Sequence, residues 1–291
     1  MTEVMRSKNE SQPTYMKKTK SGKINIKSGN NIDLVIKFTV FILTILTIIA
    51  FIIFDYTGLN LQRAIPETWH NLKLMFLQPS LNHFDWQAAI FQVGVTLGLG
   101  VLATVIGAVI AFFLALLAAQ NLSKPWISKI IRILMAFIRA VPTVLWVLIF
   151  AIAAGLGSEA AVLGMLFHSI AYLVKAFSES FEELDDGILE AMQATGSNWW
   201  HIVVHGVLPS TFTYLLSWTF LRFEVNFGIA VAMGAAAGAG GIGFELFMAS
   251  GFYFDLREVG FITYVILIVA ITLELISTQL KKRYFPSKIM S

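Results

Sequence analysis

The chain contains no cysteine among its 291 residues, and charged residues make up only 13% of it. The absence of cysteine excludes disulfide bridges, thiolate nucleophiles and cysteine-ligated metal sites. Soluble domains usually carry about 25% charged residues, so the low charge indicates that much of this chain is shielded from water.

Hydrophobic residues make up 57% of the chain, and they occur in long runs rather than in alternating or heptad patterns. A helix that crosses a bilayer needs about 20 mostly apolar residues, and backbone polar groups inside lipid must be satisfied within the segment, which favours helices. The sequence therefore predicts an all-α membrane protein with about six transmembrane helices. The expected spans cover residues 34–54, 89–119, 131–154, 160–177, 207–237 and 259–280.

Polar stretches divide the chain into four regions. Residues 1–32 form a basic tail that we expect to be disordered, and residues 281–291 form a second basic tail. Residues 33–88 hold the first span and an extracytoplasmic interfacial segment, and residues 89–280 form the core with the remaining spans. Basic tails beside spans mark the cytoplasmic side and attract membrane lipid weakly, so nucleic-acid binding is not expected.

The polar segment between the fourth and fifth spans predicts two short helices at about residues 186–206. Asp185 is an N-cap candidate for the first helix, and Gly196 suits its C-cap because glycine enters the left-handed region at low cost. Asn198 or the preceding serine can cap the second helix. Both helices would lie along the cytoplasmic surface.

Small and aromatic side chains suit this segment to a partner. Ala191 and Ala194 leave one face shallow, so that another protein can approach closely. Exposed Trp199 and Trp200 would anchor that partner. The alternative interpretation is an ordinary loop with an amphipathic helix and aromatic interface anchors, and local chemistry alone leaves both open.

The same segment resembles the docking motif of ATP-binding-cassette (ABC) importer permeases. That motif reads Glu-Ala-Ala, three residues, Gly, nine residues, Ile, one residue, Leu-Pro. The matching residues are Glu190, Ala191, Gly196, Leu208 and Pro209. Met192 stands in place of the second Ala, and Gly206 stands in place of the Ile.

The resemblance extends over residues 81–280 to the permeases of phosphonate importers. Residues 139–146 read Arg-Ala-Val-Pro-Thr-Val-Leu-Trp, similar to the family's Arg-Ala-x-Pro-x-x-x-Trp. Residues 221–226 resemble its Tyr-Arg-Phe-Glu-Ile-Asn, and residues 238–243 match its Gly-Ala-Gly-Gly-Ile-Gly. Phe-Gly follows Asn226 where the family usually has Val-Arg, which keeps a related cargo such as phosphite open.

This resemblance implies a type I ABC importer permease fold with cytoplasmic coupling helices, in a bacterial plasma membrane with both termini in the cytoplasm. It implies pairing with a second copy or a sister permease, an ABC ATPase dimer docked on the short helices, and an extracytoplasmic substrate-binding protein. The chain itself would catalyse nothing and bind no cofactor, since ATP and Mg belong to the ATPase. The implied cargo is phosphonate or a related phosphorus oxyanion.

Two alternatives stay open. The first keeps the class and changes the cargo to phosphite, a phosphate ester or another small solute. The second is a secondary transporter, which the docking motif and the lack of an evident inverted repeat disfavour.

Placing an ionisable residue inside a membrane span costs free energy, so each such residue is first considered as a functional residue. Arg139 lies in the third span, and Arg222, Glu224 and Asn226 lie in the fifth. They either line the path of a phosphonate-like anion, which guanidinium groups bind in a bidentate way, or join helices and subunits. His168 in the fourth span is more readily explained as an interior histidine with satisfied hydrogen bonds.

A glycine cluster follows the fifth span at Gly238, Gly240, Gly241 and Gly243. Its spacing formally matches a dinucleotide-binding fingerprint, but no strand is expected before it, so we interpret it as a bend near the outer gate. His201 and His205 lack a third ligand in view, so no metal site is expected. No arrangement of nucleophile, histidine and acid suggests a catalytic residue.

Overall fold

The computed structural model describes residues 16–18, 24–26, 30–55, 58 and 60–284. Most of the basic tails predicted at residues 1–32 and 281–291 lies outside these residues. The chain divides into two compact units, residues 1–64 and residues 65–291.

The first unit holds helix α1 (Asn30–Ile53), which confirms the first predicted span. Thr39, Thr44 and Thr47 lie on this apolar helix, and each hydroxyl donates to the backbone carbonyl four residues earlier. These bonds satisfy the hydroxyls within the helix, which suits a lipid environment.

Two short strands precede α1. Strand β1 (Met16–Lys18) pairs antiparallel with β2 (Ile24–Ile26), and Met16 lies opposite Ile26. They differ from the disorder expected for residues 1–32, because β-branched isoleucines favour extended backbone. For the rest of that tail, disorder stays a prediction.

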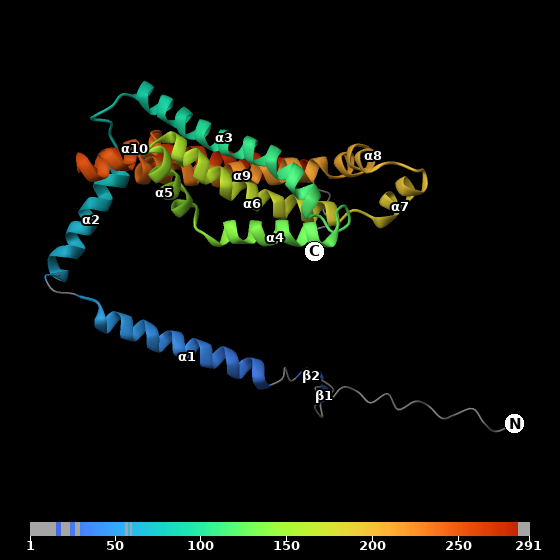
Figure 1. Cartoon of the computed structure of the whole chain (residues 1–291). Helices are drawn as coiled ribbons and strands as arrows, with labels where there is room; N and C mark the ends of the chain where they lie inside the picture. Colours follow the sequence, from blue (N-terminus) through green and yellow to red (C-terminus); the bar gives the residue numbers. More distant parts are fainter. Residues whose placement is uncertain (1–15, 19–23, 27–29, 56–57, 59, 285–291) are drawn as a thin grey trace. The chain divides into compact units, whose positions relative to one another are not determined.

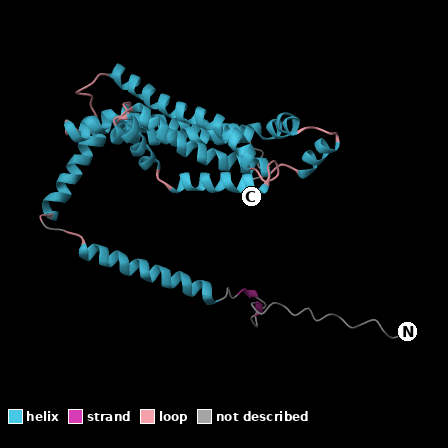
Figure 2. Ribbon diagram, in the orientation of Figure 1, coloured by secondary structure: helices cyan, strands magenta, loops and turns pink. Residues whose placement is uncertain are grey.

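The second unit is a bundle of long helices with shorter elements at its ends (Figure 1). Figure 2 shows that helices dominate this unit. The elements that follow α1 along the chain are α2 (Leu61–Leu77), α3 (Trp86–Ala118), α4 (Pro125–Ala140), α5 (Thr143–Ala154), α6 (Ser158–Glu182), α7 (Asp186–Ala194), α8 (Trp199–His201), η1 (Ile202–Val207), α9 (Leu208–Ala237), α10 (Ile242–Phe247), η2 (Met248–Phe252) and α11 (Leu256–Tyr284). Helices α3, α6 and α9 pack against one another at the centre of the bundle, and α4, α5, α10 and α11 pack around them.

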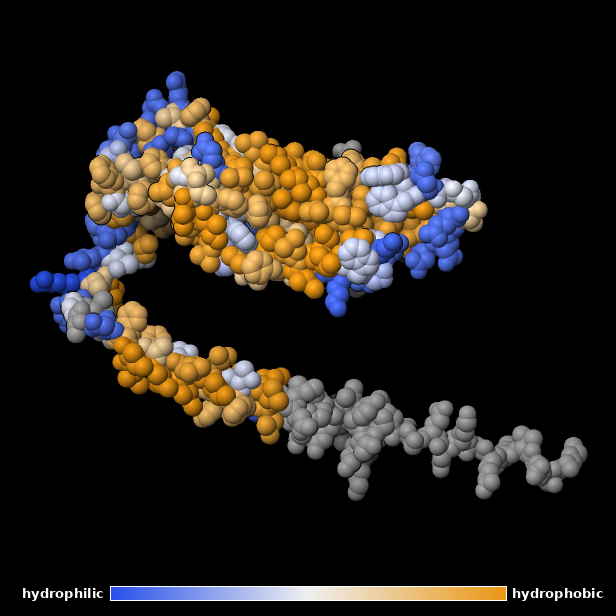
Figure 3. All heavy atoms as spheres, in the orientation of Figure 1, coloured by the Kyte–Doolittle hydropathy of each residue, from blue (hydrophilic) through white to orange (hydrophobic). Residues whose placement is uncertain are grey.

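The number of apolar helices confirms the predicted all-α membrane fold. In the described part of the chain, 5 helices are long and apolar enough to cross a membrane, and α4 with α5 makes up to 6 if that pair is one span. Figure 3 shows that the visible face of the bundle is apolar over its middle, with hydrophilic side chains gathered at its ends.

The third predicted span, residues 131–154, is not one straight helix. Helices α4 and α5 meet at 89° across Val141 and Pro142. Proline lacks a backbone N–H and disfavours helical backbone at the residue before it, so α4 ends there. The Trp146 indole donates to the Ile138 carbonyl at 3.0 Å and ties the two halves together.

Residues 238–257 are also different from the loop expected there, since they form α10 and η2. Ile242 and Ala249 are buried together with Ile262 of α11. Ile242 and Ala249 therefore pack onto the bundle, while Phe247, Phe252 and Phe254 stay exposed.

The most extensive helix contact joins α3 to α6. The buried residues of α3 include Ala103, Ala111 and Ala115, and a Cβ atom at Gly107 would lie 3.1 Å from the Ser169 Cβ atom. Small residues let helices approach closely in lipid, where packing provides the main attraction between them.

Candidate functional site

Helix α7 begins the segment predicted to dock a partner, and it lies at one end of the bundle (Figure 1). The Asp185 side chain accepts the Gly187 N–H at 2.7 Å and caps the helix, as predicted. Leu189 is buried and Met192 is partly buried against the core. One face of α7 therefore holds the helix in place, and the other remains available.

The available face carries the residues predicted for docking. Glu190, Ala191, Ala194 and Gly196 are all exposed. A carboxylate beside small side chains gives a shallow surface that another protein can approach closely.

Gly196 ends α7 in the predicted manner. Its φ is 78°, in the left-handed region, and its N–H donates to the Gln193 carbonyl at 2.9 Å. The Ser197 N–H donates to the Met192 carbonyl at 3.2 Å, which closes the turn. Apart from its two chain neighbours, no residue has an atom within 4 Å of a Cβ added at Gly196, so backbone conformation alone requires glycine here.

The two tryptophans have different roles. The Trp199 indole donates to the Leu122 carbonyl at 2.9 Å, and its ring packs against the core. The prediction that Trp199 is exposed is therefore wrong, because its indole N–H donates to a backbone carbonyl in the loop after α3 and this bond turns the ring toward the core. Trp200 is 58% exposed and remains available to a partner.

The second predicted short helix is not separate. Residues from Trp199 to Ala237 form one 39-residue helix in which the π-helix η1 links α8 to α9. Asn198 caps it by accepting the His201 N–H at 2.9 Å, as predicted. The wider π-helical turn accommodates Pro209, whose missing N–H falls in the first turn of α9. Leu208 packs against the core, and Pro209 is exposed.

A polar cluster lies inside the bundle between α6 and α9. Arg222 is buried, and its Nε donates to the Ser169 hydroxyl at 3.0 Å. Its Nη2 lies 3.2 Å from Nδ1 of His168, and its guanidinium lies over the Tyr172 ring at 5.4 Å. These contacts hold the guanidinium in one orientation.

Asn226 extends this cluster to a third helix. Its Nδ2 donates to the hydroxyls of Thr104 on α3 and Ser169 on α6, at 2.8 Å each. It lies on the Arg222 side of α9, as the spacing of four residues predicts. Asn226 therefore connects α3, α6 and α9.

Arg139 and Glu224 are partly buried. Within the described part of the chain neither forms an ion pair. Arg222 contacts His168, and no carboxylate of the described residues forms an ion pair with it. The cluster thus contains more positive than negative groups.

The glycine cluster builds the turn from α9 to α10. Gly238, Gly240 and Gly241 have φ values of 63°, 77° and 74°. A Cβ at Gly243 would overlap the backbone of Val231, so this residue permits α10 to pack on α9. The Gly241 N–H also donates to the Gln92 side chain of α3 at 3.1 Å.

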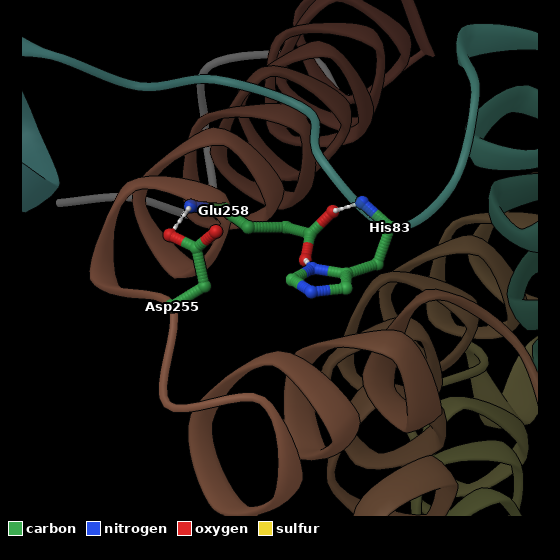
Figure 4. Close-up of side chains that lie close together, drawn as sticks. All are labelled: His83, Asp255 and Glu258. Carbon is green, nitrogen blue, oxygen red and sulfur yellow. Dashed lines mark hydrogen bonds and ion pairs between the residues drawn. The ribbon is translucent and has the colours of Figure 1, made fainter.

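A second polar cluster lies at the end of the bundle opposite α7. Figure 4 shows the His83 ring directed at the Glu258 carboxylate, with Asp255 beside them. The Glu258 carboxylate accepts a hydrogen bond from Nδ1 of His83 at 2.6 Å. It also accepts hydrogen bonds from the backbone N–H groups of Asn82 at 3.1 Å and of His83 at 2.9 Å. The Asn82 amide donates to Asp255 at 2.5 Å and holds the pKa of that carboxyl below its ordinary value.

This second cluster has metal-ligand atoms within 4.8 Å of one another. The oxygens of Glu258 are already occupied by hydrogen bonds from the loop before α3. The geometry is therefore that of a clamp between this loop and α11.

The structure brings together residues that sequence reasoning kept apart. It gathers Arg222 and Asn226 around Ser169, with His168 beside Arg222. Sequence analysis did not single out Ser169, because an isolated serine in an apolar helix carries no signal of its own. The only available signal was the pairing of two ionisable residues in neighbouring spans.

A bundle of apolar helices with an internal polar cluster and an exposed short helix at one end defines a polytopic transport permease. The chain belongs to the family of binding-protein-dependent transport system inner membrane components, which matches residues 111–288. It is therefore a multi-pass protein of the inner membrane.

Curated relatives support this membership. The phosphite transport system permease protein PtxC of Stutzerimonas stutzeri is 33% identical over 190 residues, which cover 65% of this chain and 68% of that one. The phosphate-import permease protein PhnE of Mycolicibacterium smegmatis is 32% identical over 190 residues, which cover 65% of this chain and 35% of that one. The putative cryptic phosphonate transport system permease protein PhnE2 of Escherichia coli is 33% identical over 123 residues, 42% of this chain and 98% of that one.

Solved structures share the fold. An inward-facing MetNI methionine ABC transporter structure has a TM-score of 0.63 at 15% identity, covering 71% of this chain and 100% of the matched chain. A bacterial ABC transporter for the acidic polysaccharide alginate has a TM-score of 0.61 at 13% identity, covering 87% and 98%. The predicted ABC importer permease fold is therefore confirmed.

Proposed function

We propose that the chain is the membrane permease subunit of an ATP-driven importer that moves phosphonate or a related phosphorus oxyanion into the cell. The exposed α7, with Glu190, Ala191 and Gly196 at the end of a bundle of this family, carries the proposal. The named cargoes of the relatives, phosphite, phosphate and phosphonate, support a phosphorus oxyanion.

The proposed energy source is a separate ABC ATPase dimer. Its subunits dock on the exposed face of α7 with Trp200, while Trp199, Leu208 and Pro209 position that face. ATP and Mg bind in the ATPase, and this chain catalyses nothing and binds no cofactor. ATP binding then closes the ATPase dimer and swings the helices from the inward-open to the outward-open state.

The remaining partners follow from the class. A second copy or a sister permease completes the pathway, and an extracytoplasmic binding protein delivers the cargo. Both termini and α7 face the cytoplasm, so the clamp of His83 with Glu258 and the gate-region glycines face outward. Arg139, Arg222, Glu224 and Asn226 serve the pathway or the pairing of subunits.

A gentle detergent pull-down of the tagged chain from its native membrane tests the class. We expect a P-loop ATPase to co-purify, and we expect the membranes to take up labelled methylphosphonate only when ATP is present. Unlabelled phosphite, phosphate and methionine as competitors then rank the cargoes. Recovery of the chain alone, with uptake that needs an ion gradient instead of ATP, would overturn the proposal.

A further inference from the structure

The loop between α3 and α4, residues 119–124, lies at the same end of the bundle as α7 (Figure 1). It bonds to the segment that comes directly before α7. The Gln120 N–H donates to the Glu182 carboxylate at 2.6 Å, and the Asn121 side chain donates to the Phe181 carbonyl at 2.8 Å. Because Glu182 is the last residue of α6, this loop holds the point from which the chain passes to α7.

The same loop also bonds to the segment that follows α7. The Leu122 carbonyl accepts the indole N–H of Trp199, the first residue of α8, at 2.9 Å. Both side chains are partly buried against the core. Helix α7 and its two connecting turns, residues 183–198, therefore lie between two attachments to one loop. Packing against η1 adds a third contact of α7 with the bundle.

Helix α4 is joined to both attachments by one arginine. Nε of Arg132 donates to the Ala118 carbonyl at the end of α3 at 2.9 Å, and the Ser128 hydroxyl donates to the same carbonyl at 2.5 Å. Nη2 of Arg132 forms an ion pair with Glu182. The guanidinium thus binds the ends of α3 and α6 at once, which its planar fork of donors permits and an ammonium group does not.

These bonds link the movements of four elements. Displacing the end of α6 breaks charge-assisted hydrogen bonds at Glu182 unless the loop and α4 move with it, and such bonds are stronger than neutral ones. Displacing α8 breaks the Trp199 bond unless the loop follows. Helix α4 leads through the 89° bend to α5, which packs along α6. A movement of α7 therefore has a route of contacts into the bent third span.

We infer that the α3–α4 loop transmits movement of α7 to α3 and α4, and that Arg132, Glu182 and Trp199 are positioning residues for transport. This inference rests on the proposed docking of an ATPase on α7. Helices α6 and α8 receive the movement of α7 through the chain itself. Helices α3 and α4 are distant from α7 in the sequence, so they receive it through the loop.

The ratio of solute imported to ATP hydrolysed separates this role from plain stabilisation. A contact that only stabilises the fold changes the number of active molecules, so uptake and hydrolysis fall together and their ratio stays constant. A contact that transmits movement changes the ratio, because the ATPase still binds and hydrolyses ATP while the spans respond less often.

The experiment uses the permease with its co-purifying ATPase in proteoliposomes, together with the binding protein and labelled methylphosphonate. We expect Arg132→Gln and Glu182→Gln to retain the ATPase in pull-downs and to lower the uptake per ATP by about fivefold to tenfold, the lower range of coupling between sites. Trp199→Phe, which keeps the ring but loses the bond to Leu122, should lower it in the same direction. Glu179→Gln is the matched control, because the ion pair of Glu179 with Lys175 stays within α6.

A cross-link provides a rescue. The chain has no cysteine, so a pair introduced by Ser123→Cys and Trp199→Cys is joined specifically by a short bifunctional thiol reagent. We expect a low uptake per ATP before cross-linking and a return toward the wild-type ratio afterwards, because the loop and α8 move together. Migration as a monomer in denaturing electrophoresis identifies the bridge within one chain, and each single-cysteine variant with the same reagent is the control. Arrest of import by the bridge, or a ratio that stays low, would overturn the inference.

The wild-type ratio in Arg132→Gln, Glu182→Gln and Trp199→Phe would also overturn it. If the two ion-pair variants do not fold, Trp199→Phe and the cross-link carry the test, and the wild-type ratio in Trp199→Phe overturns it equally. ATP-dependent import by the wild type with unchanged ratios in the variants would leave the proposed function standing. Import by the wild type that needs no ATP and no ATPase would overturn both.

Discussion

Met192 lies over Gly206, so that a Cβ atom added at position 206 would stand 2.6 Å from the Met192 sulfur. These are the two positions at which the chain departs from the docking motif, where Ala and Ile are usual. The long side chain at one position fills the space left at the other, because interiors are close-packed. The two departures are therefore one coupled change that holds α7 against η1.

A double-mutant cycle tests this compensation. Gly206→Ile alone is expected to lower the free energy of unfolding by about 1–3 kcal/mol through overpacking. Met192→Ala alone should lower the free energy of unfolding by about 2 kcal/mol. This is at the lower end of the range for replacing a large core side chain by alanine, since Met192 is only partly buried. The double variant restores the motif and should recover about 0.5–3 kcal/mol of coupling energy. Additive losses in melting experiments would contradict the pairing.

The docking face is tested by Glu190→Lys combined with Gly196→Val. The first change reverses an exposed charge, and the second places a branched residue at a φ of 78°, which costs about 1–2 kcal/mol locally. We expect loss of the ATPase from pull-downs and loss of uptake, with the helical signal of the spans retained. Gly94→Ala, in open space within α3, is the matched control. Uptake at the wild-type rate in the double variant would refute the docking assignment.

Substitutions at Trp199 and Trp200 distinguish a residue that positions the docking face from one that contacts the ATPase. Trp199→Phe keeps the ring but loses the hydrogen bond to Leu122, which should lower stability by about 0.5–1.5 kcal/mol. Trp200→Phe should leave the melting temperature unchanged, while Trp200→Ala weakens retention of the ATPase. Equal effects of the two phenylalanine variants on stability would show that the indole bond contributes nothing.

Gly164 tests the packing of the bent third span. An added Cβ would overlap the backbone of Val147, and backbone cannot move aside as a flexible side chain can. Gly164→Ala is therefore expected to destabilise the protein by about 1–3 kcal/mol. Gly98→Ala meets nothing within 4 Å and should be neutral or slightly stabilising, since alanine favours helices. Thermal melting of both variants makes the comparison.

The lowered pKa of Asp255 gives a defined pH dependence. A carboxyl with a folded-state pKa below its unfolded value contributes stability above the unfolded pKa, and this contribution is lost as pH falls through the folded pKa. Asn82→Ala removes the side-chain hydrogen bond that is the main cause of the lowered pKa of Asp255, so it should lower the melting temperature at neutral pH. That difference should shrink as the pH falls below 3.8. Asn71→Ala, on exposed α2, is the control, and a difference that persists in acid would contradict this origin.

Local chemistry made the caps of the docking segment predictable. Asp185, Gly196 and Asn198 each act on backbone groups within three residues or through their own φ, so nearby sequence contains the needed information. Trp199 was predicted to be exposed because its partner, the Leu122 carbonyl, lies far away in the sequence. Pro142 was visible inside the third span, but whether it bends or breaks a helix depends on what packs against both halves.

The sequence by itself determined the class of this protein, since run lengths of apolar residues and the motif around Glu190 are one-dimensional signals that membrane thickness and helix geometry make readable. It also determined that Arg222 and Asn226 share one side of a helix. Only the tertiary structure decided that His168 and Ser169 meet Arg222, that α4 and α5 meet at 89°, and that Met192 packs against Gly206. Such contacts depend on how each helix is rotated about its axis and on how closely two helices approach. The number of residues between two segments of the sequence does not determine either of these.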